Sequence, residues 1–323
     1  MRTGAAAGHR GFFHETACYG SDDDFVALTV PFVEAGLAAG EPTVLALDRH
    51  NHALVAEALG DDLARVIVLP ASDQYARPAA TIAAFRGLFA DLTAEGAAQV
   101  RIVGDVPHTG TGALWDPWAR YEAAANLAYD DFPVWGLCPY DTRTTPVAVL
   151  DEVARTHPRV ASIGHGHAGN GHTANTRFEE PAAFLGGRPP AGPDPIESAA
   201  PAAVVAAPSP RAARAAVAEV AASTGLGADR VNGLVLALSE VVTNALVHGE
   251  APVTVRAWPS EGRIHVTVTD AGPGPADPFV GLLHRPGAES IGGHGLWFAH
   301  QLCHQVTMGR DAAGFTVRLT VWA

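Results

Sequence analysis

Apolar and polar positions along the first half of the chain predict strands and helices in turn. Short apolar runs, typical of buried strands, lie at 42–47, 65–69, 100–106 and 132–138. Apolar residues recur at helical spacing over 22–39, 52–59, 79–94, 115–127 and 146–156. Strands that alternate with helices in this way predict an α/β domain with a doubly wound, mostly parallel sheet.

The last third of the chain has a different order of elements. Two helices are predicted first, at 212–224 and 228–248, and strands follow at 253–258 and 263–270. A helix at 296–302 and strands at 305–309 and 315–322 complete the pattern. This order predicts an α+β sandwich, in which one mixed sheet carries its helices on one face.

Two stretches between these regions resemble linkers. Residues 164–172 (GHGHAGNGH) predict a solvated loop that could bind metal adventitiously, and residues 186–210 are rich in Pro and Ala. Because the second stretch has too few large apolar residues for a core, we expect a semi-stiff spacer there. The predicted domains are therefore 11–185 and 211–323.

Composition narrows the classes of function. The chain has 323 residues, a formal net charge of -13 and no Lys, which argues against direct nucleic-acid binding. Cys18, Cys138 and Cys303 are far apart and form no CxxC pair, as expected in a reducing cytoplasm. No signal-peptide pattern opens the sequence and no apolar run reaches the roughly 18 residues of a membrane helix, so no membrane association is expected.

The first of three chemical motifs lies on the predicted helix 228–248. Its sequence is EVVTNALVHG, from Glu240 to Gly249, and Glu240, Asn244 and His248 follow one another at intervals of four. This spacing places all three on one helix face. An amide oxygen is a suitable ligand for Mg²⁺, and a carboxylate can accept a proton. The alternative is the polar face of an ordinary surface helix.

Two glycine-containing motifs follow. Asp270-Ala-Gly272-Pro-Gly274 comes directly after a predicted strand, where Asp can accept a hydrogen bond from an exocyclic amine and glycine allows close approach of a ligand. Gly292-Gly293-His294-Gly295-Leu296 precedes a helix, whose first N–H groups can bind phosphate. Taken singly, the first also fits an ordinary turn and the second a flexible start of a helix.

The ordered co-occurrence of these motifs resembles the GHKL family of ATPases and kinases, with a Bergerat-type fold. The resemblance covers 211–323 and implies ATP and Mg²⁺ as cofactors, with Mg²⁺ held by Asn244. It implies nucleotide contacts from His248, Asp270, Gly272, Gly274, Gly293, His294, Gly295, Leu296 and Thr316. His294 departs from the residue often found between these glycines, which puts the phosphate contact there in question.

The sequences LSEVVTNALVHG and GGHGLWFAHQLC are similar to those of the anti-sigma-factor serine/threonine kinases within that family. In that branch Glu240 is the general base that activates a Ser or Thr hydroxyl of a STAS-type anti-anti-sigma protein. The resemblance also implies a sequestered sigma factor and a homodimer. Two alternatives stay open: a non-catalytic nucleotide-binding module that only sequesters its partner, and a free-standing ATP hydrolase.

The N-terminal part resembles the MEDS sensory domain. The resemblance rests on HETACY from His14 to Tyr19, on WARYE from Trp118 to Glu122, and on CPYD from Cys138 to Asp141. It implies an α/β fold that senses a small-molecule ligand. Candidate pocket residues are His14, Glu122, Tyr140 and Asp141, and the strand ends at Asp48, Asp105 and Cys138 could line a crevice.

Two other kinds of site bear on this part of the chain: a metal or haem site and an ATP site. A metal or haem site with His14, Cys18 or Cys138 is an open alternative, although sequence spacing alone does not bring these residues together. A chain without Lys has no GxxxxGK[ST] loop, so we expect no ATP binding in this domain.

Overall fold

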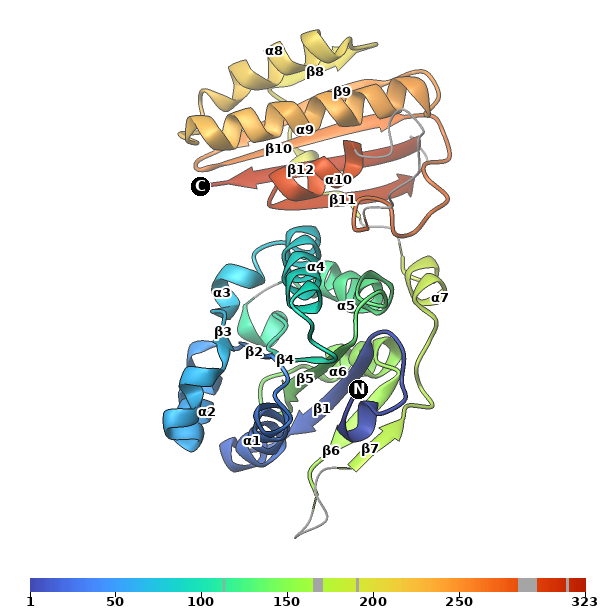
Figure 1. Cartoon of the computed structure of the whole chain (residues 1–323). Helices are drawn as coiled ribbons and strands as arrows, with labels where there is room; N and C mark the ends of the chain where they lie inside the picture. Colours follow the sequence, from blue (N-terminus) through green and yellow to red (C-terminus); the bar gives the residue numbers. More distant parts are fainter. Residues whose placement is uncertain (113, 165–170, 190–191, 284–294, 312–313) are drawn as a thin grey trace. The chain divides into compact units, whose positions relative to one another are not determined.

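The computed structural model describes residues 1–112, 114–164, 171–189, 192–283, 295–311 and 314–323. The chain divides into two compact units, Met1–Gly186 and Gly187–Ala323 (Figure 1). Each unit has its own sheet and its own core, and each is described separately below.

The N-terminal unit has a seven-stranded sheet in the order β3-β2-β4-β5-β1-β6-β7. The strands are β1 (Phe13–Tyr19), β2 (Thr43–Ala46), β3 (Ile67–Val68), β4 (Val100–Gly104), β5 (Val134–Asp141), β6 (Arg159–Ser162) and β7 (Gly171–Ala174). All neighbours are parallel except β6 and β7, which confirms the predicted mostly parallel α/β sheet.

Helices cover both faces of this sheet, as a doubly wound fold requires (Figure 1). They are α1 (Asp22–Ala38), α2 (Arg49–Leu59), α3 (Ala71–Gln74), α4 (Pro78–Ala94), α5 (Trp115–Ala128), α6 (Val147–Thr156) and α7 (Pro181–Gly186). Helices α1 and α2 bury aliphatic and aromatic side chains against one face. On the other side, α4 and α5 contribute a cluster of aromatic rings that includes Phe85, Phe89 and Tyr121.

Strand β1 is the main element that the hydrophobic pattern did not predict. It lies between β5 and β6 and pairs with both. Its sequence FHETACY places His14 and Glu15 in the interior, where they are 1% and 0% exposed. Because buried strands are recognised by apolar runs, a central strand with two buried ionisable residues escapes that test.

The C-terminal unit has a five-stranded sheet in the order β11-β12-β10-β9-β8. Its elements are η5 (Pro195–Ser198), β8 (Ala203–Ala206), α8 (Pro210–Ala221), α9 (Ala228–Val247), β9 (Thr254–Ser260), β10 (Arg263–Asp270), α10 (Gly295–Leu302), β11 (Gln305–Asp311) and β12 (Gly314–Trp322). The three α-helices lie on one face (Figure 1), which confirms the α+β sandwich. Every pair of neighbouring strands in this sheet is antiparallel, whereas the sequence predicted a mixed sheet.

The predicted spacer 186–210 differs from what its composition suggests. Strand β8 pairs with β9, and Glu197 of η5 accepts a hydrogen bond from Arg318 at 2.7 Å. Asp194 pairs with Arg263, and the Trp258 indole donates to the carbonyl of Ala199. Edge pairing and polar contacts therefore attach this stretch to the C-terminal unit, although it buries little apolar surface of its own.

Helix α9 is the one described helix that is long and apolar enough to cross a bilayer by length and composition, which the sequence analysis did not expect. Its apolar residues pack against the sheet of its own domain, among them Leu234, Leu238, Val241 and Val242.

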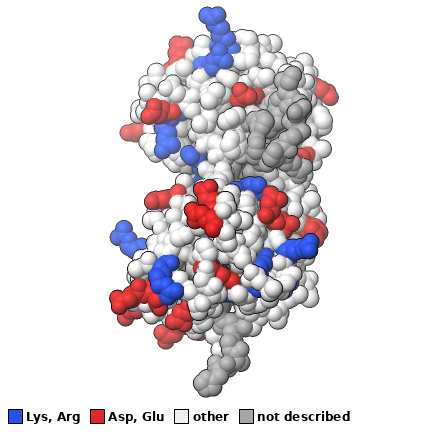
Figure 2. All heavy atoms as spheres, in the orientation of Figure 1, with Lys and Arg blue, Asp and Glu red and all other residues white. Residues whose placement is uncertain are grey.

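On the face of the molecule shown in Figure 2, acidic and basic side chains are interspersed and the Arg side chains are scattered.

Candidate functional site

A pocket of about 310 Å³ lies beneath α9 in the C-terminal unit. Its walls are largely apolar and come from α9, β10, α10 and β12, with Val268, Leu296, Phe315 and Val317 among them. The polar lining residues include Asn244, His248 and Asp270. An apolar pocket with a few placed polar groups is the usual form of a small-molecule site.

Asp270 ends strand β10 and is held in place by backbone N–H groups. Its Oδ1 accepts hydrogen bonds from the N–H of Gly272 at 2.7 Å and of Glu250 at 3.3 Å. The side chain is only 6% exposed and lines the pocket. Within the described residues, Oδ1 accepts both of the hydrogen bonds made to the Asp270 side chain. Oδ2 is therefore available to a ligand.

The glycines around Asp270 are required by space. A Cβ on Gly249 would lie 2.5 Å from the Asp270 carboxyl carbon, and one on Gly272 would lie 2.8 Å from its Oδ1. Gly274 has a φ of +78°, and a Cβ there would lie 2.4 Å from the Phe315 ring. Gly249 and Gly272 therefore allow close packing around the Asp270 carboxylate, and Gly274 allows close packing against Phe315.

The polar face of α9 lies against the start of α10. Asn244 and His248 line the pocket, while Glu240 lies one turn earlier and outside the lining. A Cβ on Gly295 would be 2.9 Å from Asn244 Nδ2 and 3.1 Å from Glu240 Oε2. The structure therefore brings Glu240 and Asn244 together with the first residue of α10, as the motif order predicts.

The remaining predictions for this site have mixed outcomes. Leu296 lines the pocket, and Gly293 and His294 lie outside the described residues. Thr316 does not line the pocket: its Oγ1 is 2.9 Å from Thr269 Oγ1 on β10. Its neighbour Phe315 lines the pocket instead, because successive strand residues point to opposite faces.

Sequence reasoning missed the apolar lining, above all Phe315, Val268 and Val317. The signal was present in the alternation of β12, where Phe315, Val317 and Leu319 all belong to the helix-facing core or pack against it. Extending that alternation back to residue 315 would have selected phenylalanine rather than threonine.

In the N-terminal unit the structure brings three of the four pocket candidates together. The Tyr140 hydroxyl donates to Glu122 Oε1 at 2.5 Å, and His14 Nε2 lies 3.5 Å from Glu122 Oε2. All three are at most 1% exposed. Burial, followed by the charge of Glu122, raises the pKa of Tyr140 well above its usual value, so its proton stays in this hydrogen bond.

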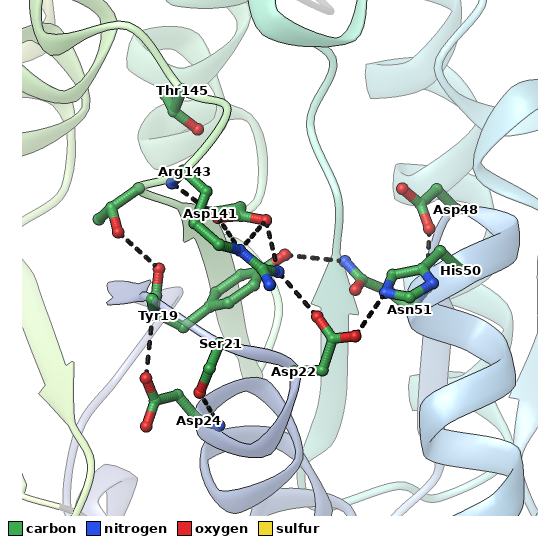
Figure 3. Close-up of polar contacts among 12 residues, drawn as sticks. Tyr19, Ser21, Asp22, Asp24, Asp48, His50, Asn51, Asp141, Arg143 and Thr145 are labelled. Atoms are coloured by element: carbon green, nitrogen blue, oxygen red, sulfur yellow. Dashed lines mark hydrogen bonds and ion pairs between the residues drawn. The ribbon is translucent and has the colours of Figure 1, made fainter.

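The fourth candidate, Asp141, lies elsewhere. It forms an ion pair with Arg143, which also pairs with Asp22 of α1 at 2.7 Å, and His50 contacts Asp22 from α2 (Figure 3). These residues lie at the carboxyl ends of the parallel strands and at the starts of the helices that follow.

A crevice of about 450 Å³ opens at that same edge of the sheet. Its lining includes Tyr19, Asp48, Asn51, Asp105 and Asp141, so the expected strand-end crevice is present there. Cys138 is not part of this lining. Asp105 Oδ2 accepts from the Asp48 N–H at 2.9 Å and from Asn51 Nδ2 at 3.0 Å. Burial raises the pKa of Asp105 to about 7, against the effect of these hydrogen bonds.

Two family models match the chain, one in each unit. The MEDS model (methanogen/methylotroph, DcmR sensory domain) matches residues 13–158, and the histidine kinase-like ATPase domain model matches residues 206–321. A comparison with curated proteins finds no match.

Among solved structures, the chain is similar to the RsbU and RsbW domains of a protein from Mycobacterium tuberculosis. The identity is 24% and the TM-score is 0.27, over 38% of this chain and 32% of that chain. The chain thus spans about a third of the length of that solved chain.

Proposed function

Because the chain joins an N-terminal MEDS sensory domain to a C-terminal histidine kinase-like ATPase domain, we propose that it is an ATP-dependent serine/threonine-protein kinase controlled by its sensory domain. The observation that carries the proposal is the pocket beneath α9, where the Asp270 carboxylate, an apolar lining and the Asn244 amide occur together.

Adenine fits this pocket by its chemistry. The flat ring is matched by the apolar side chains of Val268, Leu296 and Phe315, and its exocyclic amine is matched by the Asp270 carboxylate. The glycines at 249 and 272 leave the space that the Asp270 carboxylate needs. A volume of about 310 Å³ suits a nucleobase and its sugar.

The phosphates would extend toward the start of α10, where backbone N–H groups favour anions. Asn244, whose amide nitrogen lies close to Gly295, would hold Mg²⁺ through its amide oxygen. When bound, the ion would neutralise charge on the phosphates.

Glu240 is the proposed general base. It would accept the proton of a Ser or Thr hydroxyl while that oxygen forms a bond to the γ-phosphorus of ATP. The bond from the γ-phosphorus to the bridging oxygen breaks and ADP leaves, so the products are ADP and a phosphoprotein. Glu240 lies one helical turn from Asn244, which supports a shared site.

The partners follow from the resemblance of the motifs around Glu240 and Gly295. The acceptor is a STAS-type anti-anti-sigma protein, and the regulator sequesters a sigma factor as a cytoplasmic homodimer. The crevice lined by Asp48, Asp105 and Asp141 is the proposed site where the sensory domain receives its small-molecule ligand.

The test is transfer of label from γ-labelled ATP·Mg²⁺ to STAS-domain proteins of the same genome. Glu240→Ala should abolish transfer. Thr243→Ala is the matched control, because Thr243 is exposed on the same helix and its hydroxyl donates to the backbone carbonyl of Ser239 in that helix. Label transfer by Glu240→Ala at the rate of the unchanged protein would show that Glu240 is not the general base.

One observation favours a second function. Glu240 lies outside the residues that line the pocket, so nucleotide binding does not by itself require it. A module that binds ATP and only sequesters its partner would show tight ATP binding, capture of a sigma factor and no label on any acceptor.

A further inference from the structure

Four metal-ligating side chains meet in the interior of the N-terminal unit. They are His14 of β1, Glu122 of α5, Cys138 of β5 and His157 at the end of α6, and one ligand atom of each lies within 4.8 Å of all the others. We refer to these four residues as the His–Glu–Cys cluster. His14, Glu122 and His157 are 1%, 0% and 0% exposed.

The tautomers of both histidines follow from their outer hydrogen bonds. His157 Nδ1 is 2.8 Å from the carbonyl oxygen of Val153, which can only accept, so Nδ1 carries the proton. His14 Nδ1 is 3.0 Å from Asn126 Oδ1. The Asn126 Nδ2 donates to three backbone carbonyl oxygens, which fixes Oδ1 as the acceptor for His14.

Both Nε2 atoms therefore direct lone pairs toward Glu122. His14 Nε2 and His157 Nε2 each lie 3.5 Å from Glu122 Oε2, too far for good hydrogen bonds. Within the described part of the chain, Glu122 Oε2 and His157 Nε2 have no hydrogen-bond partner although both are buried. The Cys138 thiol can donate to His14 Nε2 at 3.5 Å, so the two acceptors without a donor among the described residues are Glu122 Oε2 and His157 Nε2. Unpaired buried acceptors are costly, and a cation between them would remove that cost.

We propose that the His–Glu–Cys cluster is a binding site for a transition-metal ion, zinc(II) first, through His14 Nε2, Glu122 Oε2, Cys138 Sγ and His157 Nε2. None of the residues of this cluster takes part in the proposed kinase chemistry, so the inference stands apart from it.

Three of the separations in the cluster are close to those of a tetrahedral zinc site, and all of them are within 4.8 Å. Zn–N and Zn–O bonds of about 2.0–2.1 Å and Zn–S bonds of about 2.3 Å place tetrahedral ligands roughly 3.3 Å apart for N–O pairs and roughly 3.6 Å for N–S pairs. The observed separations are 3.5 Å from His14 Nε2 to Glu122 Oε2 and 3.5 Å from Cys138 Sγ to His14 Nε2.

Charge balance favours a divalent ion in this interior. The Glu122 carboxylate and a Cys138 thiolate together cancel the two positive charges of zinc(II), which leaves a neutral buried site. Binding would release the Cys138 thiol proton to solvent as the S–Zn bond forms.

The outer contacts are those that metal sites use to orient their ligands. Asn126 and the Val153 carbonyl hold the two imidazoles, and the Tyr140 hydroxyl holds Glu122 Oε1 at 2.5 Å. With four protein ligands the site is closed, as structural zinc sites are. The ion would tie together the central strands β1 and β5, helix α5 and the end of α6.

The experiment uses the full-length chain with His165→Ala and His167→Ala, which removes adventitious binding by the Gly/His-rich stretch. After removal of metal with a chelator, Co²⁺ is titrated as a spectroscopic probe and Zn²⁺ is then added in competition. We expect one Co²⁺ per chain, the d–d absorption of a tetrahedral site and a thiolate-to-cobalt charge-transfer band, all displaced by Zn²⁺.

Cys138→Ser should abolish the charge-transfer band, and Glu122→Gln should weaken Co²⁺ binding at least tenfold. Cys18→Ser is the matched control, since Cys18 is an exposed cysteine on β1 and no part of the cluster, and it should change nothing. If Cys138→Ser does not fold, Glu122→Gln, which keeps the shape of the side chain, decides the question by its affinity.

Absence of stoichiometric Co²⁺ binding, or binding unaffected by Cys138→Ser and Glu122→Gln, would overturn the proposal.

Discussion

Two polar sites of this chain, one beside a pocket and one in a closed interior, are assembled in opposite ways. In the ATPase domain, Glu240, Asn244 and His248 lie on one helix and Asp270, Gly272 and Gly274 on one turn, so local spacing already places them. In the MEDS domain, the His–Glu–Cys cluster draws one residue from each of four elements between positions 14 and 157. Motifs reveal the first kind of site, whereas only tertiary structure reveals the second.

The sites also differ in how their polar groups are satisfied. Asp270 accepts two backbone hydrogen bonds and borders an open pocket, so it is ready for an exchangeable ligand. Glu122 lies in a closed interior, and its Oε2 has no hydrogen-bond partner among the described residues. On our two proposals, one domain turns over nucleotide and the other holds an ion, and the following predictions test that contrast.

The largest expected effect is on phosphoryl transfer. Glu240→Gln removes the base but keeps the shape of the side chain, so transfer to the acceptor should fall roughly 10²- to 10⁴-fold. ATP affinity, measured by calorimetry, should change less than about twofold, because Glu240 does not line the pocket. A parallel loss of ATP binding would show that Glu240 acts on the nucleotide rather than on the acceptor.

The next effect is on nucleotide affinity. Asp270→Asn should weaken ATP binding roughly 10- to 100-fold, because a charged hydrogen bond is worth about 1.5–3 kcal/mol. The same calorimetric titration with GTP provides the control, since guanine does not present the exocyclic amine of adenine to Asp270. Unchanged ATP affinity in Asp270→Asn would show that adenine does not bind at Asp270.

A smaller effect separates two neighbours on β12. Phe315→Ala removes part of the pocket wall and should weaken ATP binding roughly tenfold, which corresponds to about 1.4 kcal/mol of lost apolar contact. Thr316→Val should leave ATP affinity unchanged, because its hydroxyl contacts Thr269 instead of the pocket. A larger loss of ATP affinity in Thr316→Val than in Phe315→Ala would support the sequence prediction that Thr316 contacts the nucleotide.

The smallest effect is a pH dependence in the MEDS domain. Because the folded-state pKa of Asp105 is raised to about 7, its contribution to stability is complete below its unfolded pKa and is lost as pH rises through 7. The free energy of unfolding should therefore fall between about pH 4 and 7 in the wild type relative to Asp105→Asn. We expect a difference of about 1–2 kcal/mol, after allowance for solvent screening. Denaturant unfolding at several pH values measures it, and parallel curves for the two proteins would argue against a raised pKa.

The sequence predicted the layers of both domains because most of their elements carry ordinary periodicity. Helix α1 shows this well: Ser21 caps it by accepting from the Asp24 N–H at 3.1 Å, and acidic residues, which favour a helix N-terminus, fill its first turn. Strand β1 escaped prediction because Glu15 is buried by partners far along the chain, Trp135 and His172. Those partners are invisible to a local pattern.

The sequence did not predict side-chain directions where one residue of register or one distant contact decides them. Thr316 and Phe315 differ by a single position, which on a strand means opposite faces. Asp141 follows Tyr140 directly, yet it pairs with Arg143 at the surface while Tyr140 contacts Glu122 in the interior. Motif adjacency therefore predicted the location of both regions but not the direction of these side chains.

The most direct test of the central claim is a single-turnover reaction with protein in excess over γ-labelled ATP·Mg²⁺ and a STAS-domain acceptor present. The account predicts that the label passes to a Ser or Thr of the acceptor, with ADP as the other product. Label recovered wholly as inorganic phosphate, or left on ATP that is tightly bound, would contradict the kinase assignment.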